Sequence, residues 1–308
     1  MPPLLWTSDP PPSTDRTHFF LPNLDLAPSL LPALLALSAA VLWGISDFGG
    51  GVLGRRAPIF GVLLATQSVG FAIASIGLVI RPEPMLEGPD VGLSLAAGGL
   101  AAIGVGSLYR GLAVGRMGVV APVTAVLTAT TPAVIGIAWQ GFPVPMVFVG
   151  FAVAIVAVVI VSIVPDDTAG RPAGLGYALV GGITLGLLGV VLSRIDVQHA
   201  FAPLAFMRGV ELFLFIAAVV ILRLPWRMPL SLFPLVGLVG FVDVIGNLAF
   251  LTAARTGDLA TAAVLSSLYP VITVLLAAAL IRERITRSHA AGVGLAFVAI
   301  ALITGNVP

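Results

Sequence analysis

Long apolar stretches dominate the chain from Ser29 onward, and they restrict its fold more than any other feature. Each runs for roughly 18–25 residues, enough for a helix to cross a hydrocarbon layer of about 30 Å. A barrel would instead alternate apolar and polar residues in strands of about ten residues. The pattern therefore predicts an all-α polytopic membrane protein. Its ten spans lie approximately at residues 30–51, 59–80, 91–113, 119–139, 145–164, 173–193, 204–222, 231–253, 259–280 and 289–306.

Charged residues are scarce, and this scarcity excludes several classes of protein. Lys, Arg, Asp and Glu make up 9% of the chain, against roughly 25% in a soluble domain. A soluble enzyme and a disordered chain both need more charge, and a nucleic-acid-binding protein needs a basic face. We therefore expect no nucleic-acid partner.

Metal and cofactor chemistry also lacks its usual residues. The chain has no cysteine, so disulfides, iron–sulfur clusters and thiolate zinc sites are excluded. None of the three histidines has a metal-ligating partner at helical spacing, and no phosphate-binding loop occurs in the sequence. We expect no metal, no cofactor and no catalytic residue.

The beginning of the chain differs from the rest. Residues 1–28 are rich in proline and carry several acidic side chains. They lack the positive n-region of a signal peptide. We interpret residues 1–28 as a flexible N-terminal tail.

The arginines predict how the spans are oriented. Ten of them lie in or near the connections between spans 1–2, 3–4, 5–6, 7–8 and 9–10, whereas four lie on the opposite side and Arg208 lies within a span. Arginine-rich loops remain in the cytoplasm. The bias therefore predicts that both termini lie outside the cell membrane.

The spanning region also repeats itself. Residues 112–121 and 252–260 each contain the end of a span, a tight turn with Arg and Gly, and the start of the next span. The repeat unit holds five spans, over residues 29–165 and 170–306. Because five is an odd number, the second copy is inverted in the membrane relative to the first. The arginines on the predicted cytoplasmic side lie in the first and third loops of the first copy and in the second and fourth loops of the second copy, as an inversion requires. Inverted repeats are typical of secondary transporters, whose substrate site lies near the midplane between the halves.

Four short motifs follow one another along these repeats. They are Trp43-Gly44-Ile45-Ser46-Asp47-Phe48-Gly49-Gly50, Tyr109-Arg110-Gly111-Leu112-Ala113-Val114-Gly115-Arg116, Ser267-Leu268-Tyr269-Pro270 and Arg282-Glu283-Arg284. In order and spacing they resemble the EamA-like transporters of the drug/metabolite transporter (DMT) superfamily, over residues 30–306. The resemblance implies ten helices, in two inverted repeats around a central cavity, that move small metabolites or drugs by alternating access.

The sequence departs from the family pattern at one pair of residues. The family has a Gly-Glu pair between the fourth and fifth helices of each repeat. The first repeat here reads Gln140-Gly141-Phe142-Pro143, without the glutamate, whereas Glu283 retains it in the second. A symmetric role for the pair is therefore in doubt.

Ionisable side chains within the spans mark candidate functional positions, since each costs about 3 kcal/mol or more at the bilayer centre. Asp243 lies near the middle of span eight, one turn before Asn247, so both face the same way. We interpret them as lining the substrate pathway, with a structural hydrogen bond as the alternative. Arg208 and Glu211 of span seven are spaced to form a pair, which costs less to bury than either ion alone. We favour a structural pair over a gate or substrate contact.

Other candidates lie in spans one, two, three and nine. The family resemblance places Gln67 in a position related to that of Arg208. Asp47 follows Trp43 by one turn, and it could cap the helix, meet Arg55 or Arg56, or line the pathway. Trp43 would form a cavity wall or pack in the core. Tyr109 and Tyr269 carry hydroxyl groups that need partners when buried.

Prolines and glycines indicate where helices bend or approach closely. Pro132 and Pro270 lie at matching depth in the two copies, and each removes a backbone donor from its helix. We predict a hinge or kink at both, with plain kinked packing as the alternative. Glycine stripes in spans three and six predict close helix packing. These glycines are Gly99, Gly104, Gly106, Gly182, Gly186 and Gly189.

Together these features favour a secondary transporter, an exporter or permease for small organic solutes. Coupling to protons through Asp47, Glu211 or Asp243 and facilitated diffusion are both consistent with the sequence. A channel or regulatory membrane protein is the second possibility, although the polar stripes of channels are sparse here. A membrane-embedded enzyme is the third. The expected partners are the lipid bilayer, a small-molecule substrate and, in the coupled case, protons; the chain would act as a monomer or a homodimer.

Overall fold

The computed structural model describes most of the chain as helices. It covers residues 30–84, 86–140, 145–162, 173–195, 200–256, 262, 265–266, 268–283 and 286–304. Within these ranges there are ten α-helices and one short 3-10 helix, and no strand. The predicted tail (residues 1–28), the loop residues 141–143, Ser267 and Arg284 lie outside the described residues.

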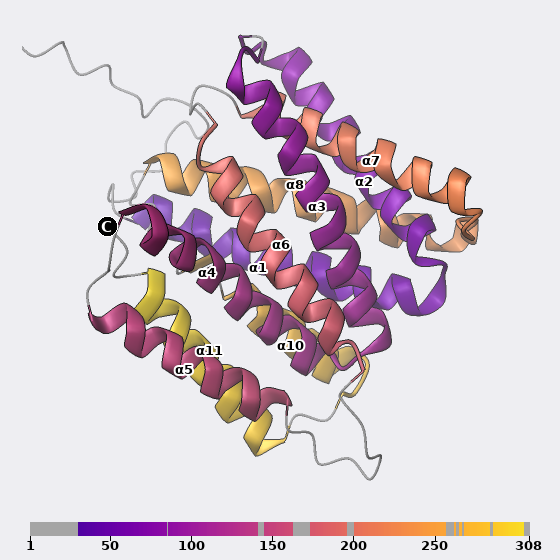
Figure 1. Cartoon of the computed structure of the whole chain (residues 1–308). Helices are drawn as coiled ribbons and strands as arrows, with labels where there is room; N and C mark the ends of the chain where they lie inside the picture. The colour runs from indigo at the N-terminus through magenta and orange to yellow at the C-terminus, as the bar shows by residue number, and fades with distance from the viewer. Residues whose placement is uncertain are drawn as a thin grey trace, which may run out of the picture.

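The helices follow the predicted spans closely (Figure 1), except that α10 (Tyr269–Leu280) covers only the second half of the ninth span, predicted at residues 259–280. The first half contains α1 (Leu30–Arg56), α2 (Ile59–Ile80), α3 (Pro89–Val114), α4 (Met117–Gln140) and α5 (Pro145–Ser162). The second half contains α6 (Leu175–Leu192), α7 (Phe201–Leu222), the 3-10 helix η1 (Leu230–Leu232), α8 (Phe233–Thr256), α10 (Tyr269–Leu280) and α11 (Arg287–Thr304). Arg55 and Arg56 lie in the last turn of α1 and not in the loop after it.

Several helices have the composition of membrane spans. Six are long and apolar enough to cross a membrane, namely α1, α2, α3, α6, α7 and α8 together with η1. The other four contain shorter apolar segments. Large apolar side chains remain on the outside of the bundle; Val79 and Ile80 at the end of α2 are each 79% exposed. An apolar exterior of this kind suits a lipid environment and not water.

Helices that are distant in sequence pack side by side. α1 lies against α8, α3 against α6, α2 against α7, and α5 against α11. Figure 1 shows α5 and α11 as an adjacent pair at one edge of the bundle. One apolar core contains Leu53, Leu63, Leu112 and Met117, each at most 2% exposed.

Glycine allows some of these close approaches. A Cβ atom placed on Gly182 of α6 would lie 2.7 Å from the Thr124 carbonyl oxygen of α4, and Gly186 and Gly104 lie against neighbouring helices in the same way. The prediction of close packing is wrong for Gly99 and Gly189, which have no neighbouring atom within 4 Å of such a Cβ. A Cβ on Gly106 would make only ordinary contacts with Leu63 and Phe215.

The two predicted kink positions differ in their surroundings. α4 continues as a helix through Pro132. Residues 265 and 266 are helical, a turn follows at Leu268, and α10 then begins at Tyr269. Pro270 lies in the first turn of α10, where a missing backbone donor loses no hydrogen bond. The hinge role of both prolines stays a prediction.

Candidate functional site

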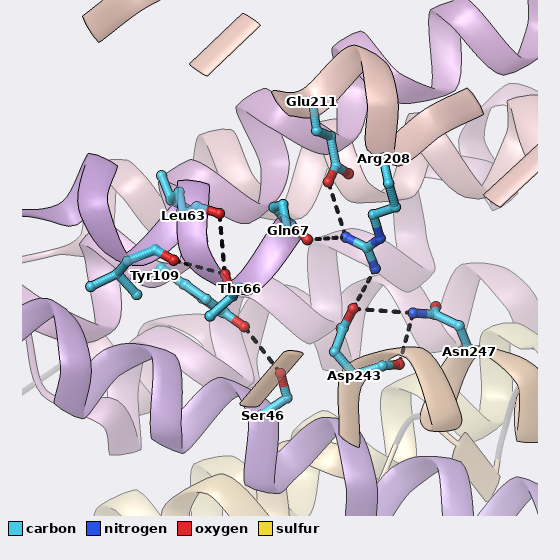
Figure 2. Close-up of polar contacts among 10 residues, drawn as sticks. Ser46, Leu63, Thr66, Gln67, Tyr109, Arg208, Glu211, Asp243 and Asn247 are labelled. Carbon is cyan, nitrogen blue, oxygen red and sulfur yellow. Dashed lines mark hydrogen bonds and ion pairs between the residues drawn. The ribbon is translucent and has the colours of Figure 1, made fainter. Parts of the chain in front are cut away.

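The centre of the site is the guanidinium group of Arg208, which lies 3% exposed on α7. Its Nη1 donates to Gln67 Oε1 of α2 at 2.6 Å and to Glu211 Oε2 at 3.0 Å. Its Nη2 donates to Asp243 Oδ2 of α8 (Figure 2). The predicted pair of Arg208 and Glu211 is therefore present. It belongs to a larger network that joins helices α2, α7 and α8.

Asp243 is the most accessible charged group of this network. Its side chain is 26% exposed, against 4% for Arg208 and 0% for Glu211. Asn247, one turn later, donates to the Asp243 backbone oxygen at 2.8 Å and to Oδ2 at 3.4 Å. As predicted, the two side chains face the same way. Asp243 is thus both paired with Arg208 and the most accessible carboxylate of the network.

Two atoms of the network have no hydrogen-bond partner among the described residues. They are Nε of Arg208 and Oε1 of Glu211, both fully buried. Nε lies against α2, where a Cβ atom on Gly70 would be 3.4 Å from it. Buried polar atoms are normally hydrogen-bonded. Within the described residues, this network is therefore incompletely satisfied.

Asp47 lies near this network without joining it. It is 8% exposed within α1 and has no hydrogen-bond or ion-pair partner in the part of the chain that the structure describes, although it is within electrostatic range of Asp243. The alternatives that it caps the helix or meets Arg55 are wrong. Asp47 is inside the helix, and Arg55 donates instead to the Leu112 and Gly115 carbonyl oxygens at 3.1 and 2.9 Å.

The neighbouring Ser46 connects three helices. Its hydroxyl lies 3.0 Å from the Tyr109 hydroxyl of α3 and 3.4 Å from the Val239 carbonyl oxygen of α8. Figure 2 shows this contact together with the Arg208 network. Tyr109 is 4% exposed, so its hydroxyl needs such a partner. The Ser46 contact places Tyr109 in the wall of the site.

An aromatic group lies on the same side of α1 as Asp47. The Trp43 ring is 5.5 Å from the Phe250 ring of α8, and it meets the Tyr269 ring of α10 edge-on at 6.3 Å. It also lies against Gly246, since a Cβ there would be 2.8 Å from the indole. Gly246 directly precedes Asn247, so the aromatic group adjoins the polar one.

A separate polar cluster lies at one end of the bundle. Glu283, in the connection between α10 and α11, accepts hydrogen bonds from the backbone N–H groups of Met117 and Gly118 at 3.2 and 3.0 Å. These are the first residues of α4, whose N-terminus favours a negative charge. Arg55 and Arg116 each approach the Glu283 carboxylate to 4.0 Å. Glu283 thus caps a helix of the other half of the chain.

Replacing Glu283 by glutamine is expected to lower the free energy of unfolding by about 1–2 kcal/mol. Glutamine keeps one acceptor but loses the charge that the helix N-terminus and both arginines favour. Unfolding of the purified protein by SDS titration in mixed micelles would measure the loss. The control is Glu87→Gln, an exposed glutamate whose substitution we expect to be neutral. Equal stability of the two variants would contradict the capping role.

The structure brings the predicted pathway residues into two adjoining groups. The polar group holds Gln67, Arg208, Glu211, Asp243 and Asn247, and the aromatic group holds Trp43 and Tyr269, with Asp47 and Tyr109 beside them. Sequence reasoning did not find Ser46, Phe250 or the helix cap formed by Glu283. Ser46 had a signal, since it directly precedes Asp47, but Phe250 resembles any other apolar residue of its span.

Comparison with known proteins agrees with this architecture. The model of the EamA-like transporter family matches residues 172–305, from just before α6 through α11. Of the 27 chains of solved structures that match, one crystal structure covers 91% of this chain and 98% of its own length, with a TM-score of 0.64 at 17% sequence identity. That likeness shows a shared fold. No curated protein matches the sequence.

The family match indicates the class of protein that the bundle resembles. Members of the family are membrane transporters of the DMT type. Six of the described helices are long and apolar enough to cross a membrane, as such a protein requires. The chain is a multi-pass membrane protein whose residues 172–305 match the EamA-like transporter family, which belongs to the DMT superfamily.

Proposed function

We propose that the protein is a secondary transporter that moves small organic metabolites or drugs across the cell membrane by alternating access, as an exporter or permease. The observation that carries this proposal is the Arg208 network. It joins α2 of the first half to α7 and α8 of the second, near the middle of these helices, beside a partly exposed Asp243. Charged groups at such a depth are costly and usually mark a substrate pathway.

The proposed architecture is a ten-span bundle of two inverted five-helix repeats, residues 29–165 and 170–306, around a central cavity. The packing pattern supports it. α1 packs on α8 as α6 packs on α3, and α2 packs on α8 as α7 packs on α3. Equivalent helices also meet each other, α2 with α7 and α5 with α11. A twofold relation between the halves would produce these reciprocal contacts, and a transporter could use it to open either side in turn.

The proposed orientation places both termini outside the cell membrane. The cluster around Glu283 supports it. Arg55, Arg116 and Glu283 lie together, so the connections between spans 1–2, 3–4 and 9–10 share one end of the bundle. That end carries the arginine-rich loops, which favour the cytoplasm.

Reconstitution into liposomes tests the proposed function. Purified protein would be assayed with labelled amino acids, nucleobases and organic cations, with and without a pH gradient, against vesicles without protein. We expect protein-dependent flux of at least one class. Stimulation by the gradient would indicate coupling to protons through Asp47, Glu211 or Asp243, and flux independent of the gradient would indicate facilitated diffusion. Absence of flux for the whole panel under both conditions would contradict a transporter.

A further inference from the structure

The charges of the site do not balance, and their sign indicates what the site binds. Arg208 is the one cation among the buried residues that the structure describes. Two carboxyl groups, Glu211 and Asp243, pair with this cation, and a third, Asp47, lies within electrostatic range of Asp243. A buried charge is tolerated only when it is paired or neutralised. The interior therefore has room for added positive charge and none for added negative charge.

Arg208 is not available to a substrate. Both of its terminal nitrogens already donate, to Gln67, Glu211 and Asp243. Its remaining nitrogen, Nε, faces Gly70 of α2 and not the partly open side of Asp243. An anion, or the carboxylate of a zwitterion, would have to displace an existing ion pair to reach the guanidinium group. The geometry therefore disfavours anionic and zwitterionic solutes.

Asp47 is the clearest sign of a missing positive partner. Its side chain is buried, with 8% exposure, and within the described ranges no side chain or backbone group bonds to it. It lies within electrostatic range of Asp243 and of Tyr269. An unpaired buried carboxylate is costly. A cation placed between Asp47 and Asp243 would give Asp47 a partner, as Arg208 already does for Asp243.

The aromatic group lies beside these carboxylates and supplies the aromatic side chains of such a cation site. Trp43, one turn before Asp47, is partly exposed and is held by Phe250 and Tyr269. Tryptophan faces attract cations, and quaternary ammonium groups are often bound between aromatic rings. Two carboxylates beside an indole thus form a group of side chains suited to a positive head group on an apolar body.

We propose that the substrates are organic cations with an aromatic or apolar body, whose positive group lies between Asp47 and Asp243 and against Trp43. The inference rests on the proposed transport function and gives it a substrate class. The class follows from the sign of the unpaired charge and from the neighbouring indole. No covalent step is involved.

Uptake by reconstituted liposomes tests the proposal with three labelled compounds that share a phenyl ring. They are benzyltrimethylammonium as the cation, phenylalanine as the zwitterion and phenylacetate as the anion. We expect the cation to be transported in preference to the other two. Replacing Asp47 by asparagine should raise the half-saturation concentration for the cation about tenfold, because one charge-assisted contact is lost. Asp47→Asn breaks no existing ion pair and removes a costly buried charge, so its unliganded stability should be no lower than that of the unchanged protein.

A matched control tests whether any lost charge has this effect. Glu87→Gln removes an exposed charge elsewhere and should leave uptake unchanged. If Asp47→Asn lowers the yield of folded protein, thermal stabilisation of the unchanged protein gives a second test. Benzyltrimethylammonium should stabilise it and the neutral isostere neopentylbenzene should not.

The outcomes distinguish this inference from the transport function. Flux of phenylalanine or phenylacetate without flux of the cation would overturn the substrate class and leave transport standing. Cation uptake that is unaffected by Asp47→Asn, or equal stabilisation by cation and isostere, would overturn the assigned position of the charge. No flux of any compound in this or the wider panel would overturn the transport function itself.

Discussion

Replacing Arg208 by methionine is expected to lower the free energy of unfolding by about 3–5 kcal/mol, because it leaves buried carboxylates without their cation. Glu211 is 0% exposed, so water cannot replace the lost partner. Methionine has a similar length and removes only the charge and the hydrogen bonds. SDS titration of the purified protein in mixed micelles would measure the loss.

A double-mutant cycle with Glu211→Gln measures the coupling between Arg208 and Glu211 apart from the cost of losing Arg208 alone. If the two side chains act as a unit, the double variant should be more stable than Arg208→Met alone, because no unpaired carboxylate remains at position 211. Arg223→Met, at the exposed end of the same helix, should change stability by no more than about 0.5 kcal/mol. Additive losses in the cycle, within about 0.5 kcal/mol, would refute the coupling.

Replacing Gly182 by valine is expected to cost about 3 kcal/mol, through overpacking between α6 and α4. A Cβ atom at this position would lie 2.5 Å from the Leu127 Cβ and 2.7 Å from the Thr124 carbonyl oxygen. The carbonyl belongs to the backbone, so the contact is relieved only if the two helices move apart. Thermal unfolding in detergent would report the loss of stability.

The same helix provides a matched control for this substitution. Gly189 is exposed, and a Cβ atom there would have no neighbour within 4 Å. Gly189→Val changes helix propensity in the same way as Gly182→Val but adds no clash, so it should leave the unfolding temperature nearly unchanged. If both variants lose the same stability, the cost comes from the helix itself and not from the contact with α4.

Much of the fold could be predicted because a membrane-spanning helix is specified by local information. The apolar length and the flanking arginines and prolines place the ends of α2 at residues 59 and 80, as the structure does. Local patterns were less reliable for packing. Gly182 and Gly189 belong to the same predicted stripe, yet only Gly182 meets another helix. Sequence spacing identifies a helix face without identifying what packs against that face.

The candidate site shows the same difference between local contacts, which could be predicted, and contacts between distant helices, which could not. Arg208 and Glu211 were predicted as a pair because three residues separate them on one helix. The contact of Arg208 with Asp243, 35 residues away, depends on how α7 and α8 are placed. The alternative that Asp47 meets Arg55 was wrong because Arg55 turns toward the end of α3. Proximity along the chain could not reveal that choice.

The pairing of α5 with α11 has a consequence for how the protein is made. A ribosome releases α5 long before α11 exists, and α1 likewise precedes its main neighbour α8. Until synthesis ends, the face of α5 that will pack on α11 must be shielded by lipid or by the insertion machinery. The same holds for the face of α1 that will pack on α8. Contacts between such distant segments form late and slowly. The last helix of the chain thus completes the packing of the first half, so biogenesis cannot finish one half before the other.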